Sequence, residues 1–351
     1  MYRPGQRGPT PKALPPFGFF RNTTTAALVG SRIALRGYPR HDRLAVPGFL
    51  QNDDNLQLIK VPSTRNVKQH PWIFLLPTLV LMSISAFVPL MAVVNYSLHT
   101  IFAGSTPEFV GLQNYAEVMG DRNFHHAMLR QLFFSALVLM LEIPLGIAIA
   151  LCMPRKGWAV GLCLVLLGVP LLIPYNVVGI VWRLFTQSDI GVIPRILSIV
   201  GYDYNVSLVP VDAFVTLLLV DVWHWTPLVA LLAYAGLQAI PQAYYQAVQV
   251  DGASAWQTFR YVTLPKLRPV LTLAVLIRFM DSFKIYSEPL LLTGGGPGNT
   301  TTFMSLFVAR KAESYDLGYA GSVSIIYLYV VIVFSYILFQ VATRSTGERR
   351  S

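Results

Sequence analysis

Six long apolar stretches dominate the sequence, and each approaches or exceeds the roughly 20 residues that a helix needs to cross a bilayer. They are residues 71–98, 131–152, 157–182, 213–238, 269–293 and 317–343. None alternates as a membrane β-strand does, and a backbone in lipid must satisfy its hydrogen bonds within its own segment. The sequence is 54% hydrophobic and 13% charged, whereas soluble domains are about 25% charged. It therefore predicts an all-α integral membrane protein with six transmembrane helices.

The basic residues are distributed unevenly between the two sides of the predicted membrane. An even number of spans places both termini on one side, and the tails and loops of that side hold 19 of the 27 Lys and Arg residues. The opposite loops, residues 99–130, 183–212 and 294–316, hold six. Because positive residues accumulate in cytoplasmic loops, we expect a multi-pass protein of the cell (inner) membrane with both termini in the cytoplasm.

Residues 1–70 form a tail rich in Pro, Gly and Arg ahead of the first span. We expect no cleavable signal peptide in it, because its best apolar stretch, Ala26–Leu35, is short and contains Arg32. Three explanations stay open: a disordered cytoplasmic arm attracted to anionic lipid, translation from a start codon upstream of the true one, and an organelle transit peptide. None of them gives the tail a fold. Residues 344–351 are expected to form a short cytoplasmic tail.

Motifs for catalysis are absent from the sequence. It contains no H-E-x-x-H and no G-x-S-x-G, and the Gly-rich stretch from Gly294 lacks the Lys of a phosphate-binding loop. Cys152 and Cys163 lie in or beside apolar runs and indicate neither a disulfide nor a metal site. We interpret His125 and His126 as a solvated pair at the membrane interface. The sequence therefore predicts no enzyme activity, no bound cofactor or metal and, because its cations are not interleaved with exposed aromatic residues, no nucleic-acid partner.

Ionisable residues inside the spans are the first candidates for function. Each costs at least about 2.5 kcal/mol near the bilayer centre, so it must face protein or water. In the fourth span, Asp221, His224 and Trp225 share one helical face. In the fifth span, one helical arc comprises Arg278, Asp281, Ser282, Lys284, Ile285 and Glu288. The spacing predicts that Arg278 pairs with Asp281, and that Lys284 pairs with Glu288. Two interpretations stay open: pairs that hold helices together, and a polar lining for a solute path.

The loop between the fourth and fifth spans, residues 239–268, has the pattern of a helix-turn-helix. Helices are predicted over Ala243–Val250 and Ala253–Val262, and Pro265 and Pro269 are expected to end the loop. Its apolar side comprises Ala247, Val250, Ala253, Trp256 and Phe259. Such a hairpin lies either in a groove of a partner protein or on the lipid surface, and these residues alone do not decide between the two.

The same loop resembles the coupling loop of ABC-importer permeases. Gln246–Phe259 followed by Thr263-Leu-Pro is similar to the family's E-A-A-x-x-D-G-A motif with its downstream Phe and Leu-Pro. Outside the loop, Val110–Tyr115, Trp225–Leu228 and Ala235–Pro241 also resemble segments of the family, and Leu292–Thr301 is similar to the G-G-P stretch of its carbohydrate-importer subfamily. The resemblance covers the chain beyond residue 70. It implies an ATPase-coupling role for Gln246, Ala247, Asp251, Gly252, Ala253, Phe259 and Pro265.

Two residues depart from the motif. Gln246 stands where the family usually has Glu, and Val248 replaces the second Ala. Gln keeps an acceptor oxygen but loses the charge, so a charge-assisted hydrogen bond to the ATPase becomes a neutral and weaker one. This departure puts the ion pair in question and leaves the docking of the loop unaffected.

The resemblance also implies the rest of the assembly. Such permeases work with a second, usually different permease chain, with two cytoplasmic ATPase subunits that use the ATP, and with an external solute-binding protein. The implied solute is a sugar, an oligosaccharide, a polyol or a glycerol phosphate, and the implied solute-path residues are those of the two spans that flank the loop: Asp221, His224, Trp225, Arg278, Asp281 and Ser282. An anionic solute would use Arg278 and Lys284.

Two alternatives remain beside this interpretation. An ABC permease for a solute other than a carbohydrate has the same loop. A secondary transporter would carry protons on buried carboxylates such as Asp221, Asp281 and Glu288 and would need no ATPase. Secondary transporters commonly contain internal repeats, and the first three spans of this sequence do not resemble the last three. The sequence therefore favours the ATP-driven importer.

Overall fold

A computed structural model describes the backbone of residues 71–102 and 106–347 and the side chains of residues 75–102 and 106–341. All of these residues belong to one compact unit, His70–Ser351. The predicted basic tail, residues 1–70, and the end of the predicted C-terminal tail, residues 348–351, lie outside the described residues.

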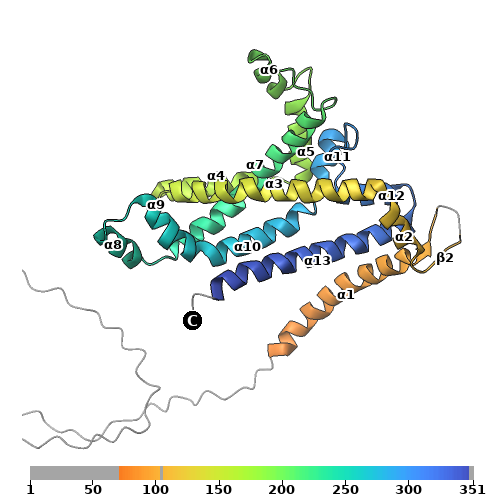
Figure 1. Cartoon of the computed structure of the whole chain (residues 1–351), viewed down its shortest axis with the longest axis horizontal. Coiled ribbons are helices and arrows are strands. Elements are labelled where there is room, and N and C mark those ends of the chain that lie inside the picture. The colour runs from red at the N-terminus through yellow and green to blue at the C-terminus, as the bar shows by residue number, and fades with distance from the viewer. Residues whose placement is uncertain (1–70, 103–105, 348–351) are drawn as a thin grey trace, which may run out of the picture. The chain divides into compact units, whose positions relative to one another are not determined.

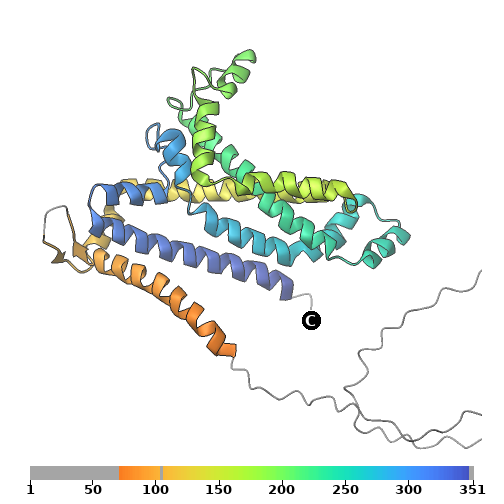
Figure 2. The same cartoon turned by 180° about the vertical axis from the view of Figure 1, so that it is seen from behind.

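Helices form almost all of the described chain, which confirms that the protein is predominantly α-helical (Figures 1 and 2). They are α1 (Pro71–Ser97), α2 (Gln113–Gly120), α3 (Arg122–Cys152), α4 (Trp158–Leu172), α5 (Tyr175–Thr186), α6 (Val192–Ile199), α7 (Pro210–Gln238), α8 (Gln242–Val250), α9 (Ala255–Thr258), the π-helix η1 (Phe259–Thr263), α10 (Leu264–Ser282), α11 (Ser287–Thr293), α12 (Met304–Glu313) and α13 (Leu317–Gly347). Two short strands, β1 (His99–Thr100) and β2 (Glu108–Phe109), pair antiparallel with His99 opposite Phe109.

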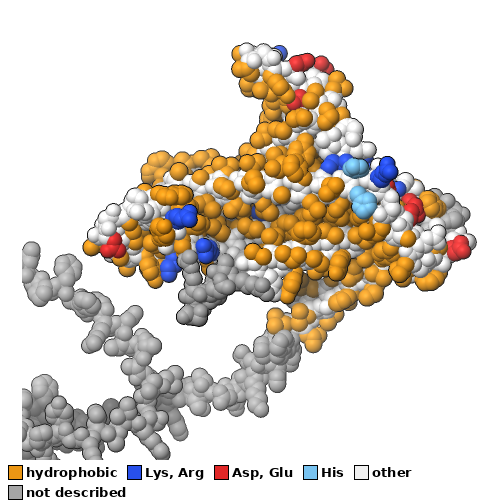
Figure 3. Space-filling view, in the orientation of Figure 1, with side chains coloured by type: hydrophobic (Ala, Val, Ile, Leu, Met, Phe, Trp, Pro, Cys, Tyr) orange, Lys and Arg blue, Asp and Glu red, His pale blue; other side chains and the backbone are white. Residues whose placement is uncertain are grey.

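Four helices in the described part of the chain are long and apolar enough to cross a membrane: Leu75–Ser97 of α1, α3, α7 and Leu317–Val341 of α13. Hydrophobic side chains cover much of the surface of the helices (Figure 3), as a lipid environment requires. The four predicted ranges 71–98, 131–152, 213–238 and 317–343 overlap these helices. The second span is longer than predicted, because its helix begins at Arg122.

The third predicted span, residues 157–182, is not one straight helix. α4 and α5 meet at an angle of 91°, and the bend falls at Ile173, which has extended backbone angles and directly precedes Pro174. The residue before a proline is driven out of the helical region by a clash with the proline ring. Prolines do not break every helix here, since Pro77 and Pro89 lie inside α1.

The fifth predicted span, residues 269–293, is also wrong at both ends. Its helix begins well before Pro269, because α9, η1 and α10 follow one another without a gap from Ala255 to Ser282. Pro265 lies in the first turn of α10, directly after η1, and does not interrupt the run of helical residues. The helix ends at Ser282, and α11 starts separately at Ser287. With its charged residues, α10 does not meet the apolarity expected of an ordinary span.

The centre of the unit is formed by α3, α7 and α10. Two glycines let these helices approach closely: a Cβ at Gly146 of α3 would lie 2.6 Å from Cγ1 of Val229 in α7, and one at Gly236 of α7 would lie 2.8 Å from Cδ2 of Leu267 in α10. α13 packs between α10 and α1, and α4 packs on α7 (Figures 1 and 2).

Candidate functional site

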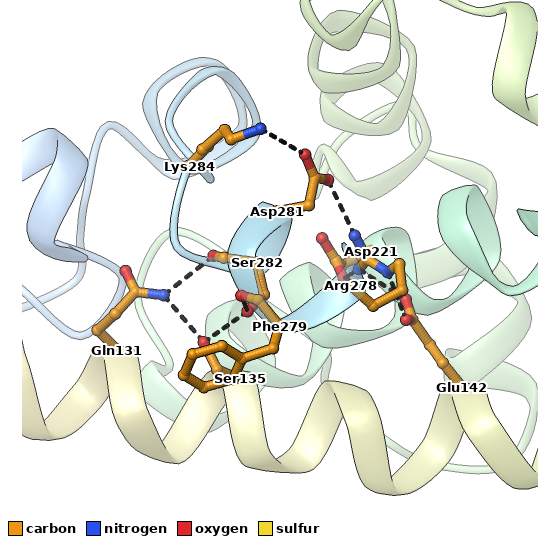
Figure 4. Close-up of polar contacts among 9 residues, drawn as sticks. All are labelled: Gln131, Ser135, Glu142, Asp221, Arg278, Phe279, Asp281, Ser282 and Lys284. Carbon is orange, nitrogen blue, oxygen red and sulfur yellow. Dashed lines mark hydrogen bonds and ion pairs between the residues drawn. The ribbon is translucent and has the colours of Figure 1, made fainter. Parts of the chain in front are cut away.

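Arg278 lies at the centre of a buried ion-pair network that we call the Arg278 cluster; its members are Arg278, Glu142, Asp221, Asp281 and Lys284 (Figure 4). Nε and Nη2 of Arg278 donate to the two carboxylate oxygens of Glu142 at 2.7 and 2.9 Å. Nη2 also donates to Asp221 at 2.7 Å, and Nη1 donates to Asp281 at 2.9 Å. Since α3 supplies Glu142, α7 supplies Asp221 and α10 supplies Arg278, the cluster joins the three central helices.

The pairing predicted for Lys284 differs from the one observed. Arg278 and Asp281 pair as predicted, but Nζ of Lys284 lies 3.3 Å from Asp281 rather than beside Glu288. The prediction assumed one continuous helix, and α10 ends before Lys284. Glu288 is instead buried in the first turn of α11, so the predicted polar arc does not exist as one helical face.

The Arg278 cluster has no net positive charge to offer to an anionic ligand. Two cations face three carboxylates, which gives a formal charge of −1 when all five groups are ionised. All three guanidinium nitrogens of Arg278 already donate to carboxylates, and its side chain is fully buried. Lys284 is the accessible cation of the group, with 75% of its side chain exposed.

Three aromatic rings lie beside this network and form what we call the aromatic cluster: Tyr175, His224 and Trp225. The ring of Tyr175 stacks on His224 with centroids 5.6 Å apart and lies 5.8 Å from Trp225. The guanidinium carbon of Arg278 lies 4.6 Å from the ring centroid of Trp225, so the two clusters are in contact. Nδ1 of buried His224 has no hydrogen-bond partner among the described residues. The cluster thus combines aromatic faces with a free polar atom.

Sequence reasoning missed the contribution of α3 to this region. Glu142, which holds Arg278, was visible as the one acidic residue that interrupts the second apolar stretch, and the cost of burying it was the signal for a partner. Gln131 and Ser135 gave no such signal. Nε2 of Gln131 donates to the carbonyl of Ser282 at 3.0 Å, and the hydroxyl of Ser282 donates to that of Ser135 at 2.8 Å (Figure 4). Ser282, a predicted lining residue, is therefore buried between helices.

The predicted helix-turn-helix is present and begins with α8. The turn is a Schellman motif: the N–H of Gly252 donates to the carbonyl of Gln249, and the N–H of Ala253 donates to that of Val248, both at 3.2 Å. Gly252 has φ = +68°, the left-handed conformation that glycine adopts without strain. A side chain at Gly252 would meet no atom of this chain within 4 Å. The glycine is thus required by backbone conformation rather than by crowding within the chain.

Ser254 begins the second helix of the hairpin with a capping box. Its backbone N–H donates to the side-chain oxygen of Gln257 at 2.7 Å, and its hydroxyl accepts from the N–H of Gln257 at 3.3 Å. We call residues 242–258 the coupling hairpin. Val250 is 87% exposed and Trp256 65% exposed, so its apolar side is not covered by this chain.

The predicted coupling residues fall in two groups. Gln246 and Ala247 lie exposed on α8, and Asp251, Gly252 and Ala253 form the turn. Phe259 and Pro265 lie further along, in η1 and at the start of α10; the ring of Phe259 packs 5.7 Å from that of Trp256. The first group forms the tip of the hairpin, and the second connects it to α10.

Comparison with known proteins identifies the class of molecule that this architecture represents. The family model described as the inner membrane component of binding-protein-dependent transport systems matches residues 142–345, which include the hairpin and both clusters. The chain belongs to this family. The predicted resemblance to ABC-importer permeases is thereby confirmed, and the permease is a multi-pass protein of the inner membrane.

Curated relatives of the permease cover most of its length. The trehalose/maltose transport system permease protein MalF of Thermococcus litoralis is 34% identical over 77% of this chain and 92% of its own. The trehalose transport system permease protein SugA of Mycobacterium tuberculosis is 31% identical over 65% of this chain. The sulfoquinovosyl glycerol transport system permease protein SmoG of Agrobacterium fabrum is 28% identical over 72%.

A solved structure has the same fold. The match is to a bacterial alginate ABC transporter in complex with a periplasmic protein that holds an alginate pentasaccharide. The TM-score is 0.68, with 21% sequence identity, and the alignment covers 79% of this chain and 95% of the other.

Proposed function

We propose that the permease forms the translocation path of an ATP-driven ABC importer for a neutral sugar or short oligosaccharide. The observation that carries this proposal is the aromatic cluster beside an arginine whose charge is neutralised by three carboxylates. Aromatic faces with a few polar groups are the usual composition of a carbohydrate site. Because Arg278 is paired with Glu142, Asp221 and Asp281, which use four of its five N–H donors, it offers no unneutralised charge to an anionic solute. The trehalose and maltose names of the relatives agree with a neutral solute.

Within this proposal the predicted solute-path residues have different roles. His224 and Trp225 contact the solute, together with Tyr175, which is 43% exposed. Asp221 and Arg278 hold α7 and α10 together and shape the path from behind. Asp281 and Lys284 lie at the accessible edge of the Arg278 cluster.

The proposed topology has six spans with both termini in the cytoplasm. They are α1, α3, the bent pair α4–α5, α7, α10 and α13. α10 has 19 residues, which corresponds to about 28 Å of helix and nearly matches the roughly 30 Å hydrocarbon core. The excess of Lys and Arg in the tails and in the loops on the hairpin's side supports a cytoplasmic position for the coupling hairpin.

The proposed partners follow from surfaces that this chain leaves uncovered. The coupling hairpin presents Val250 and Trp256 to an ATPase subunit, which binds and hydrolyses the ATP. α1 contacts mainly α13, so most of its apolar surface is left for lipid and for a second permease chain. The family is defined by dependence on a solute-binding protein, which docks at the end of the permease opposite the hairpin.

Uptake into proteoliposomes tests the proposal. The complex of both permease chains and two ATPase subunits is reconstituted with binding protein outside and ATP inside, and uptake of radiolabelled trehalose and maltose is measured. We expect Trp225→Ala to lower uptake at least tenfold with normal assembly, and Trp225→Phe to retain most of it. Trp158→Ala is the matched control, because Trp158 is 83% exposed on α4. Uptake driven by a proton gradient without ATP would instead establish the secondary transporter.

A cysteine in the hairpin tests the docking separately. Ala247 is exposed on α8, so Ala247→Cys should form a cross-link to a cysteine placed in the ATPase cleft. No cross-link from any exposed position of α8 or the turn, in a complex that hydrolyses ATP, would show that the hairpin lies on lipid.

A further inference from the structure

A basic pocket lies at the end of α3 that is far from the coupling hairpin. It has a volume of about 530 Å³, and its cationic lining consists of Arg130 and His126 of α3 with Arg310 and Lys311 of α12. No Asp or Glu is among its lining residues. Figure 3 shows Lys, Arg and His side chains gathered in the region where Figure 1 places α12. We call this site the outer basic pocket.

The outer basic pocket and the coupling hairpin lie at opposite ends of the same helix. The pocket lies near the start of α3, which has 31 residues and is therefore about 46 Å long. Beyond the other end of α3, the carbonyl of Pro154 accepts from the hydroxyl of Tyr234, and Arg155 lies 5.1 Å from the ring centroid of Tyr245 in α8. If the hairpin faces the cytoplasmic ATPase, the pocket faces the outside.

The two arginines of the pocket are bonded only to neutral oxygens by the contacts described. Nε and Nη2 of Arg130 both donate to the carbonyl of Thr302 at 3.3 Å. Nη1 of Arg310 donates to Oδ1 of Asn299 and to Oγ1 of Thr302, each at 3.2 Å, and Nη2 donates to the carbonyl of Gly294. A guanidinium has five N–H donors and a full positive charge. Both arginines therefore keep a charge that no carboxylate neutralises within salt-bridge distance among the described residues.

Lys311 is the third Lys or Arg residue of the pocket, and it is partly buried whereas Arg310 is exposed. Its Nζ lies 4.1 Å from the ring centroid of Tyr319, whose hydroxyl donates to Asp121 at 2.6 Å. Asp121 is therefore held by Tyr319, and it is not among the lining residues of the pocket. Its pKa is lowered: burial acts to raise it, but the hydrogen bonds from Tyr319 and Asn123 and the charge of Lys311 together outweigh burial.

The concentration of cations here contrasts with the rest of the outer loops. Those loops hold six Lys and Arg residues, and three of them line this one pocket. Uncompensated like charges repel one another, so gathering them costs stability unless an anion joins them. Arg310 and His126 are exposed, which lets a side chain from another protein reach them.

We infer that the outer basic pocket receives an acidic side chain of the external solute-binding protein. This inference rests on the proposed function, because it names the surface that the binding protein meets. A carboxylate forms charge-assisted, bidentate bonds with an arginine fork, and such contacts steer docking and fix its register. A solute anion is a weaker candidate, since the interior of the path has no free arginine.

Binding of the solute-binding protein to the assembled complex tests the inference. The complex is placed in nanodiscs of phosphatidylcholine, and the probe is the fluorescently labelled binding protein that stimulates ATP hydrolysis by the wild-type complex. We expect Lys311→Gln to raise its Kd about fivefold, and Lys311→Gln with Arg310→Gln to raise it at least tenfold. The dependence of Kd on salt should flatten in both. ATP hydrolysis at saturating binding protein should stay within twofold of the wild-type rate.

The control is Arg122→Gln, which removes one exposed cation from the start of α3 outside the pocket and should change Kd less than twofold. Arg310 also holds the loop at Gly294, so Lys311→Gln alone decides the test if the double variant does not assemble. A panel of Asp→Lys and Glu→Lys variants of the binding protein provides a charge-swap test. We expect one of these variants to bind the wild-type complex weakly and to bind the Lys311→Glu complex more tightly.

The outcomes separate this inference from the proposed function. No binding to the wild-type complex by any solute-binding protein overturns both. Equal Kd values for wild type and the Lys311 variant overturn the inference alone. A changed KM for the solute with an unchanged Kd for the binding protein assigns the pocket to a solute anion and also overturns it. If Lys311→Gln changes the Kd only when the nanodisc contains phosphatidylglycerol, the pocket binds a lipid headgroup. That outcome also overturns the inference.

Discussion

Replacing Arg278 with methionine should destabilise the permease more than any other single change in the Arg278 cluster. The substitution leaves the carboxylates of Glu142 and Asp221 without a cation, and these residues are 0% and 5% exposed. Removing one partner of a buried ion pair costs about 3–5 kcal/mol. For the compact unit His70–Ser351, an unfolding entropy of about 2.1 cal/mol/K per residue converts this cost into a fall in Tm of roughly 5–8 °C.

Two further variants separate the charge effect from a loss of packing. Arg278→Met combined with Glu142→Leu and Asp221→Leu removes the charges together, and replacing a buried ion network by apolar residues of similar volume is close to neutral for stability. We therefore expect this triple variant to recover most of the lost Tm. Lys284→Met is the control, because its side chain is 75% exposed and exposed ion pairs contribute about 0–1 kcal/mol.

The measurement is the fraction of purified complex that stays monodisperse in size-exclusion chromatography after heating at a fixed rate, because membrane proteins commonly unfold irreversibly. Sugar uptake is measured on the same preparations. A wild-type Tm for Arg278→Met with abolished uptake would refute the argument that Arg278 holds the helices together. It would favour direct contact of Arg278 with the solute.

Three further outcomes are expected. Gly252→Val should lower solute-stimulated ATP hydrolysis at least tenfold, because a β-branched residue is strained by about 1–3 kcal/mol at φ = +68°. Gly252→Asn should retain most of the hydrolysis. An equal loss of hydrolysis in the two variants would point to crowding by the ATPase. Gln246→Glu should keep uptake within about twofold of wild type, because it restores the acid usual in the motif; a severe loss would show that a carboxylate is not accepted there. Gly146→Ala should destabilise the complex by about 1–3 kcal/mol through overpacking against Val229, measured as apparent Tm, with Gly161→Ala as control because its Cβ would meet nothing within 4 Å.

The sequence predicts the elements of this protein better than their ends. Hydropathy locates α1, α3, α7 and α13 because lipid selects for composition over a whole span, so a single residue changes little. Proline is less informative, because it breaks the path at Pro174 but lies inside a continuous helix at Pro269. Whether a proline breaks a membrane helix depends on groups of neighbouring helices that replace the lost hydrogen bond. The sequence of one segment does not reveal those neighbouring groups.

The candidate site shows the same division between local and distant information. Arg278 and Asp281 are three residues apart, and their pairing was predicted from helical spacing. The bond between Arg278 and Glu142 joins positions 136 residues apart, so it depends on how α3 and α10 pack. The Schellman turn at Gly252 is local and falls between the two helices predicted for the loop. The outer basic pocket draws on α3, α12 and residues of the loop before α12, and it was not predicted.

The two helices that leave the coupling hairpin are joined to each other again at the Arg278 cluster. α7 runs from Asp221 to Gln238, and α10 runs from Leu264 to Arg278; these lengths correspond to roughly 25 and 21 Å of helix. Asp221 and Arg278 are hydrogen-bonded at 2.7 Å, and between that bond and the hairpin Gly236 brings the helices together at Leu267. Because α7 and α10 are in contact both at Gly236 and at the Asp221–Arg278 ion pair, a change in the angle between these helices would break a buried ion pair. If the coupling hairpin moves with an ATPase subunit as proposed, we therefore expect α7 and α10 to rotate together and to carry His224 and Trp225 of the aromatic cluster with them.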